Sequence, residues 1–439
     1  MLDRLQQIVG LESLRTGAAA APWKVNGVTV PVVLPRSAEQ VAAVLALASE
    51  AGWRVLPAGA GSWLDAGPAA PPPDLILATT RLAGVAEYEP ADLTVGVEAG
   101  MPLGGLQRLL ADERQWLALD PPGDPAGTVG ATVATASAGP LRLGYGTPRD
   151  LVLGVQLATG DGRLLELGGR VVKNAAGFDL TRLVVGSRGT LGVITRLNLR
   201  LRALPATDRT VVLHVDGPAA ALERVAAMRA SGAEPVALEI LSPALGRLFP
   251  GDGWTIAARL HGDAEVVADG LRRLLAAAGP GARTLSPAEA WPAWAALQCG
   301  EGAAALSIRL ADLPSRLERT LQLAMDGIAA AGSTTLEGPW GIAVHAGDGI
   351  VRVLAPAGTP PLPESAAARF VAAMEAARAE LAQRRATLIV ARGVEILGGR
   401  LDAYGDVGPT LRIMRSVKQE FDPAGILSPG RFVVQGCSE

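Results

Sequence analysis

The segment VVKNAAGFDLTRLVVGSRGTLGVIT (residues 171–195) carries the strongest signal in this 439-residue chain. It places Lys173 beside Asn174, although the whole chain contains only three lysines and three asparagines. A rare residue that survives such a compositional bias is a better pointer than a common one. In GSRGTLG, glycine recurs at every third position, and glycine lets a backbone approach a ligand closely. The segment predicts a binding loop, with a buried, self-satisfied polar turn as the alternative.

Two glycine-rich stretches precede this segment. WRVLP (53–57) has the composition of a strand, and the loop AGAGSW (58–63) follows it at once. No GK[ST] follows the loop, and Leu64 occupies the third glycine position, so neither a Walker loop nor a complete Rossmann fingerprint is present. The second stretch, TVGATVATAS (128–137), consists almost entirely of small residues. Taken singly, the first fits a tight turn as well as a phosphate loop, and the second fits a tightly packed helix start.

The elements around these loops indicate an α+β chain. A strand is expected at 28–35, followed by a helix that begins at the Ser37 capping box and ends at Gly52. Further strands are expected at 75–80, 93–99, 151–158, 162–168 and 191–204. Beyond a boundary at 203–210, strands alternate with alanine- and arginine-rich helices, which predicts a second lobe built on an antiparallel sheet. A long helix is expected at 366–385 and another within 401–439.

Composition excludes several classes of protein. A net charge of −3 gives no electrostatic reason to expect nucleic acid as a partner. Two distant cysteines and three scattered histidines form no spaced metal motif and no disulfide framework, so a metal site is not expected. No apolar run approaches the ~20 residues of a membrane span, and the N-terminus lacks a signal-peptide core. These features predict a cytoplasmic protein without a membrane span.

The ordered motifs resemble a known family. The glycine loop, the small-residue stretch, GYGTPRD (144–150), VVKN-AGFD and GSRGTLGVIT together are similar to the FAD-binding domain of the vanillyl-alcohol oxidase superfamily, the PCMH-type fold. Within it, the chain most resembles the FAD-binding (E-type) subunits of glycolate oxidase. The ending FDPAGILSPGRF (421–432) resembles that family's closing signature, with Ser428 where asparagine is usual. The resemblance covers 25–205 and 401–432 and is weak between them.

The resemblance implies both an architecture and a cofactor site. It implies a two-subdomain PCMH-type FAD-binding domain at 1–205, an α+β cap domain at 206–400, and a segment at 401–439 that returns to the first domain. The glycine loop would bind the FAD pyrophosphate, and the other two stretches would line the remainder of the dinucleotide. The implied cofactor-binding residues are Ala58, Gly59, Ala60, Gly61, Ser62, Trp63, Thr128, Gly130, Ala131, Ala134, Ser137, Lys173, Asn174, Gly186, Gly189, Gly192 and Ile194. The first loop holds no histidine, which favours non-covalent attachment of FAD.

The catalytic residues are left open. The superfamily's hydroxy-acid dehydrogenases carry a metal-binding pattern like HxGDGNxH, and here only His345, Gly347, Asp348 and Gly349 match it. Arg352 stands in place of the second histidine, and a single remaining histidine is too few for a metal site or for the usual base. His345 is therefore expected to be a loop or core residue. Weak catalytic candidates are Lys173, Arg352, His345 and Tyr404.

Three functions remain open at this point. In the first, the chain is a subunit of a 2-hydroxy-acid (glycolate-type) dehydrogenase complex. Its FAD would then accept or relay electrons between a catalytic flavoprotein subunit and an iron–sulfur subunit. In the second, it is a scaffold or assembly subunit whose flavin is structural. In the third, it is a self-sufficient FAD-linked oxidase of a small hydroxy acid. Arg309 and Arg352 are possible carboxylate ligands among 37 arginines, and the sequence does not distinguish them.

Overall fold

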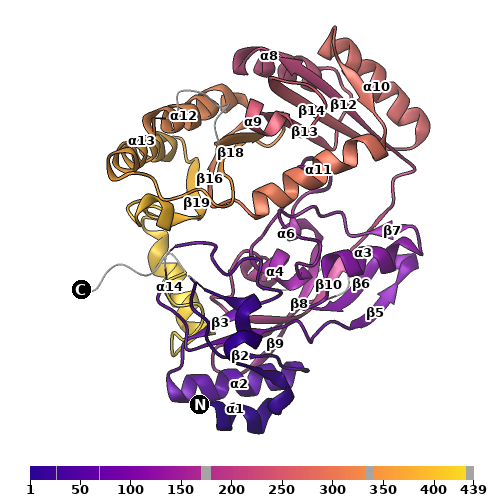
Figure 1. Cartoon of the computed structure of the whole chain (residues 1–439). Coiled ribbons are helices and arrows are strands. Elements are labelled where there is room, and N and C mark those ends of the chain that lie inside the picture. The colour runs from indigo at the N-terminus through magenta and orange to yellow at the C-terminus, as the bar shows by residue number, and fades with distance from the viewer. Residues whose placement is uncertain (26, 69, 170–178, 333–339, 432–439) are drawn as a thin grey trace.

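The computed structural model describes residues 1–25, 27–68, 70–169, 179–332 and 340–431. Lys173 and Asn174 lie outside the described residues, so the hypothesis built on them stays a prediction. Figure 1 shows two lobes stacked one above the other, with the final helix running back along the N-terminal lobe.

A small, mostly parallel sheet forms the base of the N-terminal lobe. Its order is β1 (Leu14–Arg15), β2 (Val32–Val33), β4 (Leu75–Ala78) and β3 (Val55–Ala58), with β2, β4 and β3 parallel. Helices α1 (Leu2–Val9) and α2 (Ala38–Ala51) pack against it. The predicted boundaries of α2 are confirmed: Ser37 Oγ accepts from Gln40 N, and Gly52 ends the helix at φ 67°. The strand expected at 28–35 is reduced to Val32–Val33, between two prolines.

A second, antiparallel sheet lies beside the first. Its order is β5 (Val85–Glu89), β6 (Thr94–Glu98), β10 (Val193–Arg200), β8 (Val152–Ala158) and β9 (Leu164–Gly168). Strand β5 was not expected from the sequence, since its residues VAEYE are exposed or half-buried and show no apolar run. The helices of this part are α3 (Leu103–Ala111), α4 (Val129–Ala134), α5 (Arg142–Tyr145), α6 (Pro148–Leu151) and α7 (Leu180–Val184). The short strands β7 (Gln115–Trp116) and β11 (Arg202–Ala203) pair with each other.

One antiparallel sheet of eight strands forms the second lobe. Its order is β15 (Arg283–Leu285), β12 (Thr207–Val215), β14 (Trp254–Gly262), β13 (Ala237–Leu241), β17 (Gly341–His345), β18 (Ile350–Ala355), β16 (Leu306–Ala311) and β19 (Thr387–Arg392). The predicted α+β class and the antiparallel second sheet are therefore confirmed.

The two faces of this sheet are covered differently. Side chains alternate between faces along each strand, so Val211 and Leu213 pack outward while Val212 packs inward. Four helices cover the outer face: α8 (Pro218–Ala230), α10 (Ala264–Ala278), α12 (Leu317–Ala330) and α13 (Glu364–Gln383). The inner face packs on α11 (Pro287–Gly302), which lies between the lobes in Figure 1. The short helix α9 (Pro243–Gly246) follows β13. The inner face is thus the one turned toward the N-terminal lobe.

The last helix, α14 (Thr410–Phe421), returns the chain to the N-terminal lobe. Beyond it, Val55 N donates to Ile426 O at 2.9 Å, and Ser428 N donates to Val55 O at 2.9 Å. The C-terminal segment therefore adds directly to the edge of β3, next to the glycine loop.

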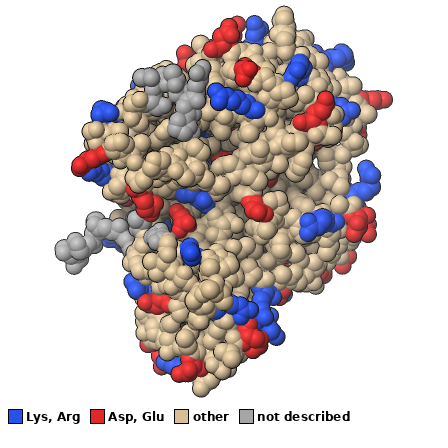
Figure 2. Space-filling view, viewed as in Figure 1, with Lys and Arg blue, Asp and Glu red and all other residues tan. Residues whose placement is uncertain are grey.

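The surface in Figure 2 carries basic and acidic side chains interspersed over a mostly uncharged face. Within the described ranges, no helix is both long enough and apolar enough to cross a membrane.

Candidate functional site

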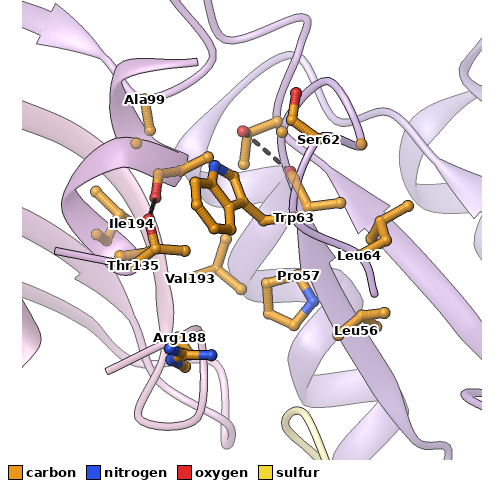
Figure 3. A pocket seen from close by; sticks show the side chains of 18 of the residues that line it. Leu56, Pro57, Ser62, Trp63, Leu64, Ala99, Thr135, Arg188, Val193 and Ile194 are labelled. Atoms are coloured by element: carbon orange, nitrogen blue, oxygen red, sulfur yellow. Dashed lines mark hydrogen bonds between the residues drawn. The ribbon is translucent and has the colours of Figure 1, made fainter. Parts of the chain in front are cut away.

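A hollow of about 800 Å³, including space open to solvent, lies between the end of β3 and the start of β10. In Figure 3, Ser62, Trp63 and Pro57 lie on one side of the hollow, and Ala99, Thr135 and Ile194 lie on the other. Its lining residues are Leu56, Pro57, Ala58, Gly59, Ala60, Gly61, Ser62, Trp63, Leu64, Ala66, Thr79, Ala99, Gly130, Ala131, Ala134, Thr135, Arg188, Gly189, Gly192, Val193, Ile194 and Arg431.

The glycine loop after β3 presents unused backbone donors to the hollow. The loop turns at Gly61, whose φ of 97° suits glycine and whose added Cβ would lie 2.7 Å from Pro22 O. The N–H groups of residues 59–63 donate no hydrogen bond to any described part of the chain. Successive free N–H groups of this kind form an anion-binding concavity, the geometry that a pyrophosphate needs.

The opposite wall is built from small residues that let helix α4 approach closely. A Cβ on Gly130 would lie 2.7 Å from both the Cβ and the carbonyl oxygen of Ala99. Thr128 Oγ1 caps the helix by accepting from Ala131 N at 3.2 Å. Ala131 and Ala134 then face the hollow with side chains no larger than a methyl group. The small-residue stretch is thus both a packed helix start and a cavity wall.

The third wall is the turn before β10. Gly189 has φ 70°, and an added Cβ would lie 3.0 Å from the ring of Pro57. The neighbouring Arg188 also has a positive φ of 54°, and its N–H donates to Ala134 O at 2.7 Å. This turn therefore ties the third wall to the end of α4 and places Arg188 in the lining, below Val193 in Figure 3.

Two arginines supply positive charge to the site. Arg188 Nη1 is buried without a hydrogen-bond partner in the described structure, and its guanidinium lies 5.8 Å from the ring centroid of Tyr404. Arg431 is 7% exposed and donates to Leu64 O and, at 3.3 Å, to Ala66 O. Burial lowers the pKa of Arg431, and arginine side chains stay protonated in proteins. The arginines and free N–H groups together suit a dinucleotide diphosphate.

Most of the sequence-predicted cofactor residues lie around this hollow. Those that line it are Ala58, Gly59, Ala60, Gly61, Ser62, Trp63, Gly130, Ala131, Ala134, Gly189, Gly192 and Ile194. Thr128 is instead the α4 cap, Ser137 is buried 2.6 Å from Thr135 Oγ1, and Gly186 forms a turn at φ 85°; none of the three lines the hollow. Contact with a cofactor remains a prediction for all of them.

Sequence reasoning missed several lining residues. Arg188 lies within the GSRGTLG motif and Arg431 within the closing signature, yet neither was singled out. Pro57, Thr79, Ala99 and Val193 come from strand ends and carry no local signal of a binding role.

Of the described catalytic candidates, His345 and Arg352 lie on the neighbouring strands β17 and β18 of the second lobe, whereas Tyr404 precedes α14. His345 Nδ1 is 2.7 Å from Glu239 Oε1, and both side chains are fully buried. Burial lowers the pKa of His345 well below its ordinary value, so the ring is neutral at physiological pH. Arg352 forms a buried ion pair with Glu301, and Tyr404 Oη donates to Arg431 O at 3.1 Å. Among the described residues, no cluster of three or more His, Cys, Asp or Glu side chains is arranged to hold a metal.

Family models match the chain at two places. The FAD binding domain matches residues 31–168, and the C-terminal domain of FAD linked oxidases matches residues 404–432. The first match holds the glycine loop and α4, and the second holds Tyr404 and Arg431. Both matched segments therefore contribute walls of the same hollow.

The chain is similar to several curated relatives. It is 32% identical over 47% of its length to D-2-hydroxyglutarate dehydrogenase of Xanthomonas citri, spanning 44% of that protein. It is 42% identical over 28% of its length to the glycolate oxidase subunit GlcE of Escherichia coli, spanning 35% of that protein. An uncharacterized FAD-linked oxidoreductase of Mycobacterium tuberculosis is 29% identical, with 98% of each chain aligned. The chain thus spans less than half the length of the first two relatives.

The architecture recurs in a solved structure. The substrate-bound p-cresol methylhydroxylase superimposes with a TM-score of 0.74 over 98% of this chain and 95% of that chain, at 16% identity. At this identity the likeness concerns the fold, which is the expected PCMH-type fold. The chain therefore carries an FAD-binding domain in its N-terminal half and the C-terminal domain of FAD linked oxidases near its end.

Proposed function

We propose that this chain is the non-covalent FAD-binding subunit of a 2-hydroxy-acid dehydrogenase complex of the glycolate type. The observation that carries the proposal is the hollow itself. It combines free backbone N–H groups at 59–63 with the small residues of α4 and the guanidinium groups of Arg188 and Arg431. The similarity to hydroxy-acid dehydrogenases and to GlcE supports the substrate class and the subunit role.

Each wall has a distinct role in this proposal. The N–H groups of residues 59–63 hold the pyrophosphate, and the two arginines neutralise its charge. When bound, FAD supplies the two-electron oxidation–reduction chemistry. The small side chains of Ala131 and Ala134 exclude water while leaving room for the planar parts of the cofactor. The histidines lie in the second lobe and Cys299 is exposed on α11, so the described lining offers no histidine or cysteine for covalent attachment.

The absence of a metal pattern supports a role within a complex. Each histidine in the described structure is engaged elsewhere: His345 with Glu239, His261 with Tyr145, and His214 with Thr255. We therefore propose that electrons pass between this flavin and partner subunits, a catalytic flavoprotein and an iron–sulfur protein. A scaffold with a structural flavin and a self-sufficient oxidase are the competing functions.

The test begins with the chain purified alone. We expect a flavin spectrum, and we expect the flavin to be released by acid precipitation, as non-covalent attachment requires. Under anaerobic conditions, glycolate or D-lactate is expected to bleach the flavin fully only when the partner subunits are co-expressed. Rapid bleaching of the isolated chain would favour the self-sufficient oxidase. A colourless protein that still assembles with its partners would favour the scaffold.

A further inference from the structure

The inner face of the eight-stranded sheet carries a cluster of buried charged side chains. The register aligns Arg309 with Arg352 across β16 and β18, and His345 with Glu239 across β17 and β13. Arg352 is also aligned with Ala343, two residues before His345 on β17, so all four side chains share one face. We call these four residues the inner-face cluster. Arg352 Nη2 donates to Ala138 O at 3.2 Å, so the cluster is turned toward the FAD-binding lobe.

Two guanidinium groups around the cluster have acidic partners, whereas Arg309 has none. Arg352 pairs with Glu301, Arg142 Nε lies 3.8 Å from Asp348 Oδ2, and His345 is bonded to Glu239. Arg309 makes no ion pair or hydrogen bond through its side chain to any described residue, and its Nε is buried. A largely buried charge without a partner is expensive, because it has lost water and gained no counter-charge. The guanidinium of Arg309 therefore has no counter-charge in direct contact among the described residues.

Arg309 is close enough to three other arginines for their charges to affect its pKa, and one of these arginines lines the FAD hollow. Burial, together with the nearby charges of Arg352, Arg142 and Arg188, lowers the pKa of Arg309 to about 10, which leaves it cationic at neutral pH. Arg188 is itself a lining residue of the hollow.

The strand beside Arg309 meets the rim of the same hollow. On β19, which pairs with β16, Ala391 O accepts from Gly67 N at 2.9 Å. The next residue, Arg392, donates through Nη2 to Ser62 O at 2.7 Å. The strand that pairs with β16 thus touches the rim formed by the glycine loop, three residues after Ile389, the residue aligned with Arg309.

We propose that Arg309 binds the carboxylate of a small monoanionic acid at the rim of the FAD hollow. A guanidinium matches a planar carboxylate through two parallel hydrogen bonds, and one unmatched positive charge balances one negative charge. This inference rests on the proposed function, because it requires FAD in the hollow, and it adds a carboxylate-binding site beside that FAD.

The experiment uses the FAD-loaded protein and two probes that differ in charge. Oxamate is a monocarboxylate without a hydroxyl group to oxidise, and methyl oxamate is its neutral ester. We expect oxamate, but not the ester, to perturb the flavin absorbance in a saturable titration. Arg309→Gln is expected to raise the Kd of oxamate at least tenfold, and Arg309→Lys to raise it less, with FAD content unchanged. Arg272→Gln, an exposed position on α10 of the same lobe, serves as the control and should bind oxamate like the parent.

A second readout comes from thermal stability. Without an acid present, Arg309→Met is expected to raise Tm, because the substitution removes an unpaired charge. Oxamate should raise the Tm of the parent and leave that of Arg309→Met unchanged.

The outcomes separate this inference from the function on which it rests. A parent protein that holds no FAD would contradict the proposed function. If the parent holds FAD but oxamate leaves its flavin absorbance unchanged, the proposed carboxylate site does not exist. The same follows if Arg309→Gln binds oxamate with the Kd of the parent. If Arg309→Gln loses FAD and oxamate has no effect on the parent, Arg309 binds the cofactor and not a carboxylate ligand.

Discussion

At Gly61 the requirement for glycine comes from two separate constraints. The φ of 97° disfavours any side chain, and an added Cβ would lie 2.7 Å from a carbonyl oxygen. We expect Gly61→Ala to displace the loop and to weaken FAD binding at least tenfold, because the free N–H groups no longer converge. The FAD content after gel filtration and the Kd from fluorescence quenching measure this effect.

The matched control for Gly61 is Gly358→Ala. Gly358 also has a positive φ, 79°, but an added Cβ would meet nothing within 4 Å. Each variant loses about 1–2 kcal/mol from left-handed strain, and only Gly61→Ala should lose FAD. Equal FAD content in the two variants would show that the loop geometry is unimportant for the cofactor.

Glu239 and His345 form a buried pair that should shape the pH dependence of stability. Burial and the charge of Glu301 raise the pKa of Glu239 in the folded protein well above 4.5. Protonated Glu239 therefore stabilises the fold at low pH, and this stabilisation is lost as the pH rises through the pKa of Glu239 in the folded protein. Burial and the charge of Arg352 lower the pKa of His345 in the folded protein well below 6.5. The folded protein therefore favours neutral His345, and the stabilisation that this gives is lost as the pH falls below 6.5. Between 6.5 and 4.5 the two effects oppose each other, since the folded and unfolded states each hold one proton on the pair.

Replacing Glu239 by glutamine should make the effect of His345 protonation on stability measurable. In Glu239→Gln only His345 still titrates, so stability should fall by ~1.4 kcal/mol per pH unit relative to the parent as pH falls from 6.5 to 4.5. Urea denaturation at a series of pH values measures the difference, with exposed Glu265→Gln as the control. Parallel stability curves for Glu239→Gln and the parent would rule out this assignment of protons.

The partners of Arg309 and Arg352 could not be predicted from the sequence. Arg309 and Arg352 were equal candidates for a carboxylate among 37 arginines. Only the packing of α11, which brings Glu301 to Arg352, leaves Arg309 as the unpaired one. Glu301 is 51 residues from Arg352 in the chain, and no local pattern predicts such an ion pair. By contrast, the glycine loop was identifiable because its constraint is local.

Among the elements, α14 fixes the returning C-terminal segment through a buried ion pair. Lys418 Nζ donates to Asp422 Oδ2 at 2.6 Å, to Thr190 O at 2.6 Å and to Leu427 O at 3.0 Å. Asp422 is 1% exposed and also accepts from the backbone N–H groups of Ile426 and Leu427. One of the three lysines of the chain therefore joins α14 to the wall of the FAD hollow.

Removing one partner of this pair should be costly. Asp422→Asn leaves a buried ammonium without its counter-charge, and we expect a loss of about 3–5 kcal/mol in the free energy of unfolding. The double variant Asp422→Asn/Lys418→Met should recover part of that loss, because no unpaired charge remains. On the same helix, Glu420→Gln has an exposed side chain and should change stability by less than about 0.5 kcal/mol. A double variant less stable than Asp422→Asn alone would contradict this explanation.

The elements that the sequence predicted well are those with a strong local pattern. Helix α2 has a cap, an apolar face and a terminal glycine, and its boundaries agree with prediction. Strand β2 was predicted too long, because Pro31 and Pro35 bracket it and proline has no N–H for a ladder. Strand β5 was missed because its stability comes from pairing with β6, a tertiary contact, and not from its own composition.

At the scale of the whole molecule, the two lobes have largely separate cores. The buried residues of the main core of the second lobe lie between Val211 and Ala403, and the partly buried Leu143 of the first lobe packs against this core. The cores of the first lobe draw on residues 5–201 and on Phe421, Ile426 and Leu427. The apolar cluster between the lobes includes a single fully buried side chain from the first lobe, Leu141. The lobes therefore share few of the contacts that would make them unfold together.

This division predicts two calorimetric transitions, of which FAD shifts only one. The hollow is lined by residues of the first lobe and the C-terminal segment, so FAD stabilises that unit by about 2.7 kcal/mol at 100 times its Kd. The transition of the second lobe should keep its temperature as FAD is added. Arg352→Gln removes the ion pair with Glu301 and the bond to Ala138 O, and should move the two transitions further apart. A single transition that shifts as a whole with FAD would mean that the interface, despite its few buried contacts, couples the lobes into one cooperative unit.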